Sequence, residues 1–184
     1  MNRRTSAHAN LTWLAWPASA SVIAASVAVF SLQAFAQPTP QAAISGQARA
    51  AEGDSLRIGD HRIRLWGIDA PEAEVDCGNE HPSQAAEDAL TEIIGNRVVE
   101  CTVRETDARG REVSVCTVGG RDLAATLVER GWARDLPRYS CGAYASAEAR
   151  ARELRRGLWA MQCAGMWGDR DYSPDRCRQP EGGN

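Results

Sequence analysis

The chain has 184 residues with 21 basic and 24 acidic side chains, a formal net charge of −3, and none of the basic residues is lysine. A net acidic protein is not a general nucleic-acid coat, because such binding depends on neutralising many phosphates. Any recognition of phosphate must therefore be local, and arginine suits it because its planar guanidinium binds oxyanions in bidentate fashion.

Residues 1–36 have the features of an export signal. Arg3 and Arg4 supply a positive start, an apolar stretch runs from Leu11 to Phe35, and residues 34–36 form an A-x-A cleavage motif. We expect cleavage there and a mature protein in the periplasm or outside the cell. The alternative is a retained leader, which would anchor the domain to a membrane. The sequence beyond the leader has no other stretch that could span a bilayer.

Six cysteines follow the expected leader. They are Cys77, Cys101, Cys116, Cys141, Cys163 and Cys177. An even number in an exported chain favours disulfides over free thiols, and no Cys-x-x-Cys pair indicates zinc. We expect the cysteines near the C-terminus to tie that tail to the body of the domain.

A β-hairpin is the first strong structural signal. Residues 37–43 have the composition of a linker, and a strand begins at residue 44. Two short alternating runs then flank a Gly59-Asp60 pair of the kind that closes two-residue turns. Folding the chain about this pair places Ser55 opposite Arg64.

Charged side chains gather at one end of this hairpin. Asp54 precedes its first run, whereas Asp69 and Glu72 follow its second run, which carries Arg64. Three carboxylates and a guanidinium at one sheet end need a partner, and a hard cation together with a phosphate would supply it. Strict alternation would put Asp54 and Arg64 on opposite faces. The chain must therefore turn or twist at Gly53 if both are to face one site.

Helical and strand patterns follow in alternation. A helix that opens at Ser83 is stopped by Gly95, and strands over 98–103 and 113–118 flank a turn at 106–111. Strands first, with helices inserted and appended, predict a small α+β domain.

Two more helices and a tail complete the chain. Asp122 caps the first helix, which ends at Gly131. The second helix carries one apolar stripe at intervals of three and four. The stripe consists of Tyr144, Ala147, Ala151, Leu154 and Leu158. Residues 160–184 have no such periodicity and form a cysteine-containing tail.

Cys101 and Cys116 lie in the two strands that flank the 106–111 turn. If this hairpin centres near residues 108 and 109, the two cysteines are directly opposite and within bridging range. We expect a disulfide between them.

Three segments resemble, in the same order, the signatures of the staphylococcal nuclease (thermonuclease) family. They are Gly53-Asp54-Ser55, Arg64-Leu65-Trp66-Gly67-Ile68-Asp69-Ala70-Pro71-Glu72 and Asp107-Ala108-Arg109-Gly110-Arg111. The ending Gly157-Leu158-Trp159 is also similar, so the resemblance covers roughly residues 44–159. A lone Asp-Ala-Pro-Glu would be weak, whereas three signatures in the correct order are specific.

The resemblance implies a fold and a cofactor. The fold would be a five-stranded OB-fold β-barrel with three α-helices, and the cofactor would be Ca²⁺. Asp54 and Asp69 would bind the cation through their side chains, and Ala70 through its backbone carbonyl oxygen.

The resemblance also implies hydrolysis of phosphodiester bonds in DNA and RNA. Glu72 would hold a water molecule as general base, and Arg64 and Arg111 would clamp the scissile phosphate. Tyr139 falls where the family places a tyrosine against the nucleotide, and Arg109 lies in a turn that contacts substrate. A phosphate clamp carries no sequence information, so we expect little base preference.

Several positions depart from the family's pattern. Ala70 replaces a threonine, which matters little if only the carbonyl oxygen binds. Ala108 and Arg109 replace a lysine and a tyrosine, and Pro137 replaces a second tyrosine. Glu52 stands where the acidic residue is usually aspartate. These turn and loop positions leave nucleotide preference open.

Two other functions remain open at this stage. An OB barrel can bind single strands by stacking and charge without catalysis, but the acidic net charge and an aromatic content of 6% argue against this. An uncleaved leader would favour an envelope-anchored structural domain. The sequence implies no protein partner, and we expect a monomer.

Overall fold

The computed structural model describes residues 42–75, 77–173 and 177. The expected leader and residues 37–41 of the expected linker lie outside the described residues. None of the helices within these ranges is long and apolar enough to cross a membrane.

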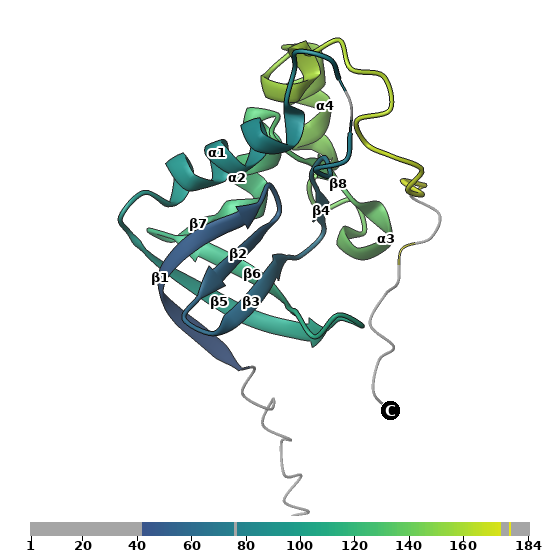
Figure 1. The fold of residues 1–184 in the computed structure, drawn as a ribbon. Coiled ribbons are helices and arrows are strands. Elements are labelled where there is room, and N and C mark those ends of the chain that lie inside the picture. The colour runs from purple at the N-terminus through teal and green to yellow at the C-terminus, as the bar shows by residue number, and fades with distance from the viewer. Residues whose placement is uncertain (1–41, 76, 174–176, 178–184) are drawn as a thin grey trace, which may run out of the picture. The chain divides into compact units, whose positions relative to one another are not determined.

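A barrel of five longer strands forms the body of the molecule (Figure 1). They are β1 (Ala43–Glu52), β2 (Ser55–Ile58), β3 (His61–Leu65), β5 (Val98–Thr106) and β6 (Glu112–Val118). The strands pair in the order β3-β2-β1-β5-β6 with antiparallel neighbours, and a parallel pairing of β3 with β6 closes the barrel. Shorter strands are β4 (Ile68–Asp69), β7 (Arg121–Asp122) and β8 (Arg134–Asp135). The predicted α+β class and five-stranded OB-fold barrel are confirmed.

The β2–β3 hairpin has the predicted register. Ser55 lies opposite Arg64, and Ile58 opposite His61 across the Gly59-Asp60 turn. Leu56 and Ile63 point into the barrel and are each 1% exposed. Because side chains alternate along a strand, Arg64 and its even-numbered neighbours on β3 point outward.

The β5–β6 hairpin is longer than its sequence pattern indicates. β5 continues to Thr106, beyond the predicted 98–103 range, with a bulge between Val103 and Glu105. Cys101 and Cys116 are directly opposite each other and joined by a disulfide. Both are almost fully buried in the barrel core.

Helices cover one end of the barrel (Figure 1). They are α1 (Pro82–Ile94), α2 (Leu123–Arg130), α3 (Pro137–Ser140), α4 (Ala145–Glu153) and the 3₁₀ helix η1 (Gly157–Ala160). The N-cap of α2 is as predicted, because Asp122 Oδ1 accepts a hydrogen bond from Ala125 N at 3.1 Å. Its end at Gly131 is also as predicted, with a left-handed φ of 81°. The three helices of eight or more residues are α1, α2 and α4.

The predicted single stripe on the last helix is wrong at its C-terminal end. α4 stops at Glu153, and Leu154 is 54% exposed. The chain turns at Arg155 (φ 49°) and Gly157 (φ 51°) so that Leu158 N can donate to Gly131 O at 2.9 Å. A side chain at Gly157 would begin 2.7 Å from that same oxygen, so this close contact between backbones requires glycine. Leu158 is fully buried, but from η1.

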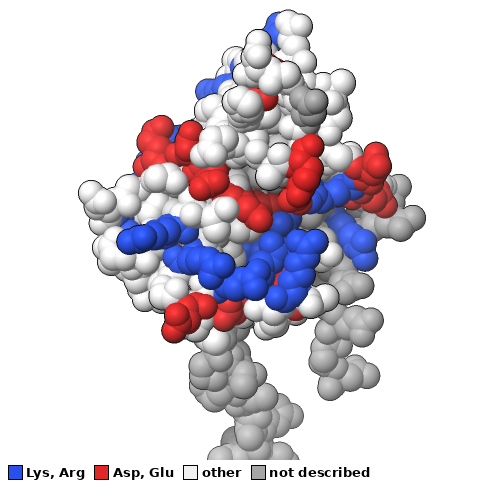
Figure 2. Space-filling view, viewed as in Figure 1, with Lys and Arg blue, Asp and Glu red and all other residues white. Residues whose placement is uncertain are grey.

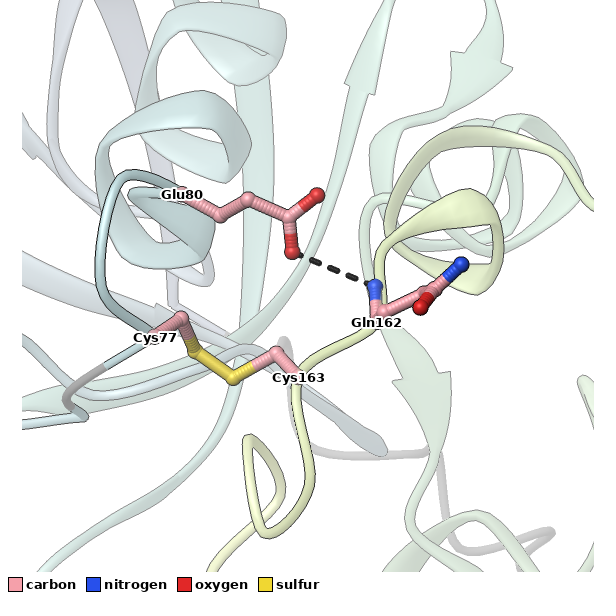
Figure 3. Close-up of a disulfide and its surroundings, with 4 residues drawn as sticks. All are labelled: Cys77, Glu80, Gln162 and Cys163. Carbon is pink, nitrogen blue, oxygen red and sulfur yellow. Dashed lines mark hydrogen bonds between the residues drawn. A yellow bond between two sulfur atoms is a disulfide. The ribbon is translucent and has the colours of Figure 1, made fainter.

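Two disulfides tie the C-terminal tail to the domain. Cys163 is bridged to Cys77, and Cys177 to Cys141. Figure 3 shows the first bridge beside a hydrogen bond of 3.1 Å from Gln162 N to Glu80 Oε2. The tail also packs on the domain, since Met166 is 5% exposed within a small core cluster.

Candidate active site

Asp54 lies in a tight turn between β1 and β2. Glu52 pairs with Ser55, so Gly53 and Asp54 form the two-residue turn and strand alternation does not apply to them. This resolves the difficulty that alternation raised. Gly53 is needed for a steric reason, because a Cβ there would lie 2.5 Å from the Ala86 side chain and 2.8 Å from that of Ala70.

Arg64 joins two of the predicted metal ligands. Its Nη1 lies 2.8 Å from Asp54 Oδ2, and its Nη2 lies 3.2 Å from Asp69 Oδ1. Burial disfavours the charged guanidinium, but the carboxylates of Asp54 and Asp69 outweigh it and raise the pKa of Arg64. A guanidinium fixed by two charge-assisted contacts has its orientation set before any substrate binds.

Asp69 is the most deeply buried of the carboxylates, at 0% exposure. It lies in β4, which pairs with β8. Burial raises the pKa of Asp69, and hydrogen bonding from Tyr172 and the charge of Arg170 oppose this. Tyr172 OH and Arg170 Nη1 lie 2.5 Å and 2.6 Å from Asp69 Oδ2.

Glu72 follows Pro71 and is much more accessible, with 46% of its side chain exposed. Its carboxylate accepts a short hydrogen bond from Arg170 Nη2. One guanidinium of the tail therefore neutralises both Asp69 and Glu72.

Arg111 reaches the same region from the β5–β6 turn. Asp107 shapes this turn, because its Oδ1 accepts hydrogen bonds from the backbone N–H groups of Arg109 and Arg111, each at 2.9 Å. Its Oδ2 accepts from Arg111 Nε at 2.8 Å. Burial opposes ionisation, but these N–H groups lower the pKa of Asp107. The terminal Nη1 of Arg111 forms a long ion pair of 3.9 Å with Glu52 Oε2.

Apart from Asp69, which is fully buried and lines neither, the predicted site residues line two adjoining hollows. One is a pocket of about 390 Å³ whose wall includes Arg64, Glu72, Arg109, Arg111 and Tyr139. The other, of about 260 Å³, is lined by acidic side chains and includes Asp54, Ala70 and Glu72. Glu72 belongs to both, so the predicted base stands between the predicted phosphate clamp and the predicted metal ligands.

The first pocket contains residues that the sequence did not single out. Arg138 of α3 lies 5.7 Å from the Tyr139 ring, and both line the pocket. Arg170 of the tail lines it too. Tyr172 is held by Arg134, whose guanidinium carbon lies 3.4 Å from the ring centroid. The one sequence signal for the tail contacts was the position of Cys163 and Cys177 on either side of residues 170–172.

The candidate donors are of the type that a hard cation prefers, but they are not gathered into one cluster. Asp54, Asp69 and Glu72 supply carboxylate oxygens, the ligands that Ca²⁺ prefers in proteins. No three acidic, histidine or cysteine side chains in the described ranges form a ready metal cluster. The carboxylates instead face Arg64 and Arg170. A cation bound here would neutralise Asp69 and Glu72 in place of the Arg170 guanidinium.

The chain is similar to known proteins. The model of the family described as "Staphylococcal nuclease homologue" matches residues 62–161, more than half of the chain. The "Probable staphylococcal-like nuclease CAN2" of Oryza sativa subsp. japonica is 32% identical over 108 residues, 58% of this chain and 28% of that protein. An "Uncharacterized endonuclease" of Escherichia coli O157:H7 is 29% identical over 133 residues, 68% of this chain and 84% of that protein.

A third relative is named for a biosynthetic process and not as a nuclease. The "Succinoglycan biosynthesis protein ExoI" of Rhizobium meliloti (strain 1021) is 34% identical over 130 residues, 65% of this chain and 66% of that protein. The chain thus spans slightly less than two thirds of this relative and under a third of the rice protein.

Proposed function

The chain belongs to the staphylococcal nuclease family, and from this premise we propose that it is a calcium-dependent nuclease that hydrolyses phosphodiester bonds of DNA and RNA with little sequence preference. The observation that carries the proposal is the shared pocket, whose wall includes Glu72, Arg64 and Arg111 together. A general base and two oxyanion-binding side chains around one hollow are the groups that phosphodiester hydrolysis requires.

Glu72 is the proposed general base. Its exposed carboxylate can accept a proton from a water molecule, whose oxygen then forms a bond to phosphorus while the bond to the leaving oxygen breaks. General-base assistance contributes typically 10²–10⁴-fold in rate. Arg170 must leave Glu72 for this step, because its guanidinium occupies the carboxylate that would accept the proton.

Arg64 and Arg111 are the proposed phosphate clamp. Arg64 is fixed by Asp54 and Asp69, and Arg111 by Asp107. Guanidinium groups held in place can meet the charge that develops on the phosphoryl oxygens without reorganising during the reaction. Neither contacts a base edge in this scheme, which supports activity on many sequences.

Asp54, Asp69 and the carbonyl oxygen of Ala70 are the proposed ligands of Ca²⁺. When bound, the cation would polarise a phosphoryl oxygen and stabilise negative charge. Tyr139 and Arg109 line the same pocket as the clamp and are proposed to contact the nucleotide.

The direct test is digestion of a plasmid and of an RNA by the mature protein, with calcium and with EGTA. We expect cleavage of both substrates in calcium and none in EGTA. Binding of single strands with no cleavage in any divalent cation would overturn the proposal in favour of a non-catalytic OB-fold module. The contact of Arg170 with both Asp69 and Glu72 is the observation that favours this second candidate.

We also propose that the protein is exported. Three disulfides among the described cysteines support an oxidising compartment. The protein purified from an exporting host should begin at Gln37, which an intact-mass measurement checks. A mass that still includes residues 1–36 would support the anchored alternative.

A further inference from the structure

Three arginines form a ladder on the outer face of the barrel. Arg49 of β1 lies directly opposite Arg57 of β2, and Arg57 lies directly opposite Arg62 of β3. All three are exposed, whereas the flanking Leu56, Ile58 and Ile63 point into the core. The three guanidinium groups therefore project from adjacent strands on one side of the sheet.

This arrangement is unfavourable for the protein alone. Like charges directly opposite on neighbouring strands repel one another and destabilise a sheet. Throughout residues 42–75, 77–173 and 177, no ion pair or side-chain hydrogen bond is made by Arg49, Arg57 or Arg62. Some exposed arginines elsewhere have a carboxylate partner, as Arg130 has in Glu92, and others have none in the described ranges. The three guanidinium groups of the ladder therefore have no ion-pair partner among the described residues.

The ladder continues into the proposed active site. Arg62 and Arg64 are two residues apart on β3 and both point outward, so their Cα atoms are roughly 6.6–6.8 Å apart along the strand. Arg64 contacts Asp54 and Asp69 at the sheet end. Figure 2 shows blue side chains gathered in a band across this face of the barrel, with a larger group of red side chains above it and a smaller one below it. An anionic polymer is attracted along the band and repelled from the acidic side chains on either side of it.

We propose, on the basis of the function proposed above, that Arg49, Arg57 and Arg62 bind the phosphate backbone of a single-stranded polynucleotide whose scissile phosphate lies at Arg64. Each guanidinium can donate hydrogen bonds to one phosphate. The described ladder has no aromatic side chain on which a base could stack, so we expect binding to the ladder to be independent of base sequence. A single strand suits the convex outer face of a barrel, because it can bend around it. A duplex is stiff over about 150 base pairs and touches such a face over a short arc. The ladder should therefore lower KM for long strands relative to dinucleotides.

The test compares two variants with equal loss of charge. The ladder variant is Arg49→Gln, Arg57→Gln and Arg62→Gln together. The control is Arg121→Gln, Arg150→Gln and Arg155→Gln, three exposed arginines elsewhere that have no side-chain partner among the described residues. Removing mutual repulsion should leave the ladder variant at least as stable as the wild type, which thermal unfolding checks.

Binding is measured first, by fluorescence anisotropy of a labelled 20-nucleotide single strand in EGTA over a range of salt concentrations. Loss of three phosphate contacts should lower the slope of log K against log[salt] by about 2, at roughly 0.7 per phosphate on a single strand. At low salt we expect the dissociation constant of the ladder variant to rise at least tenfold, and that of the control by less than threefold. Equal effects in the two variants would overturn the proposal, as would a duplex that binds as tightly as the single strand and depends equally on the ladder.

Turnover with calcium then separates the ladder from the catalytic proposal. The ladder variant should keep its kcat on both a long strand and a dinucleotide, and raise KM only for the long strand. An unchanged KM for the long strand contradicts the ladder. If neither the wild type nor any variant cleaves either substrate, the proposed nuclease function is wrong. The binding measurement then still tests whether the ladder binds single strands.

Discussion

The edge of the barrel and the C-terminal tail bring side chains to the same carboxylates by different physical means. At the barrel edge, strand register and a two-residue turn determine where Asp54 and Arg64 meet. In the tail, Arg170 arrives about a hundred residues later and is held by covalent bridges and packing on either side. A site built at the edge is a property of local sequence, whereas a contact from the tail depends on the whole folded chain.

The largest effect should come from the barrel side, at the proposed base. Glu72→Gln should lower kcat by about 10²–10⁴-fold, because the amide cannot accept the proton of the attacking water. Steady-state hydrolysis with saturating calcium measures this. Glu153→Gln, an exposed acid at the end of α4, is the matched control and should be close to wild type. Near-normal kcat in the Glu72 variant would remove Glu72 from the role.

The next effect distinguishes the clamp from simple docking. Arg64→Lys and Arg111→Lys should each lower kcat by roughly 10²–10³-fold, the range seen when one oxyanion-stabilising donor is lost. Lysine keeps the charge but not the bidentate fork, so affinity should change much less. Arg121→Lys on the exposed surface is the control. A variant that retains kcat and needs only more substrate would make that arginine a docking charge.

The stability of the protein tests the register of the barrel strands independently of the candidate active site. Replacing both Cys101 and Cys116 by alanine opens a loop with a sequence separation of 15, and the chain-entropy estimate for such a loop is about 3 kcal/mol. We expect the free energy of unfolding, measured by urea denaturation, to fall by that amount while kcat is retained at low temperature. Peptide mapping of the wild type that pairs Cys101 with any residue other than Cys116 would contradict the register.

The smallest expected effect is on calcium affinity and comes from a residue of the tail. It tests directly whether the tail competes with the barrel edge for the same carboxylates. Arg170→Ala removes a cation that competes for Asp69 and Glu72, so calcium should bind more tightly. We expect the dissociation constant for calcium, measured by isothermal titration calorimetry, to be roughly tenfold lower. This is the contribution of one charge-assisted hydrogen bond, reduced because Arg170 is partly exposed to solvent. Arg130→Ala, whose exposed guanidinium pairs with Glu92, is the control. An unchanged or weaker affinity would mean that Arg170 positions the carboxylates rather than competing for them.

These two regions also explain what the sequence could and could not predict. The hairpin register, the Asp122 cap and the Gly131 stop depend on residues a few positions apart, and all three are as predicted. The alternation rule raised a false difficulty for Asp54, because the residue lies in a turn and not on a strand. Helical spacing at Leu154 was misleading for a related reason, since the docking of Gly157 against Gly131 ends the helix early.

The tail contacts lay beyond any local pattern. Arg170 and Tyr172 sit in a segment without periodicity, and their partner Asp69 is 101 and 103 residues away. Neither residue type at that position indicates a contact with a buried carboxylate. Only the cysteine positions predicted that the tail is bonded to the domain. Because six cysteines allow about 15 pairings, the sequence did not predict which surface the tail would cover.

The order of the two tail bridges along the chain has a consequence for proteolysis. Cys141 lies between Cys77 and Cys163, and Cys163 lies between Cys141 and Cys177, so the two bridged loops overlap. A single backbone cut between Cys163 and Cys177 therefore releases nothing, since each new end is still bonded to the domain on its own side. The nicked protein would migrate as one species until reduced. Arg170, whichever side of the cut it falls on, would remain covalently attached beside Asp69.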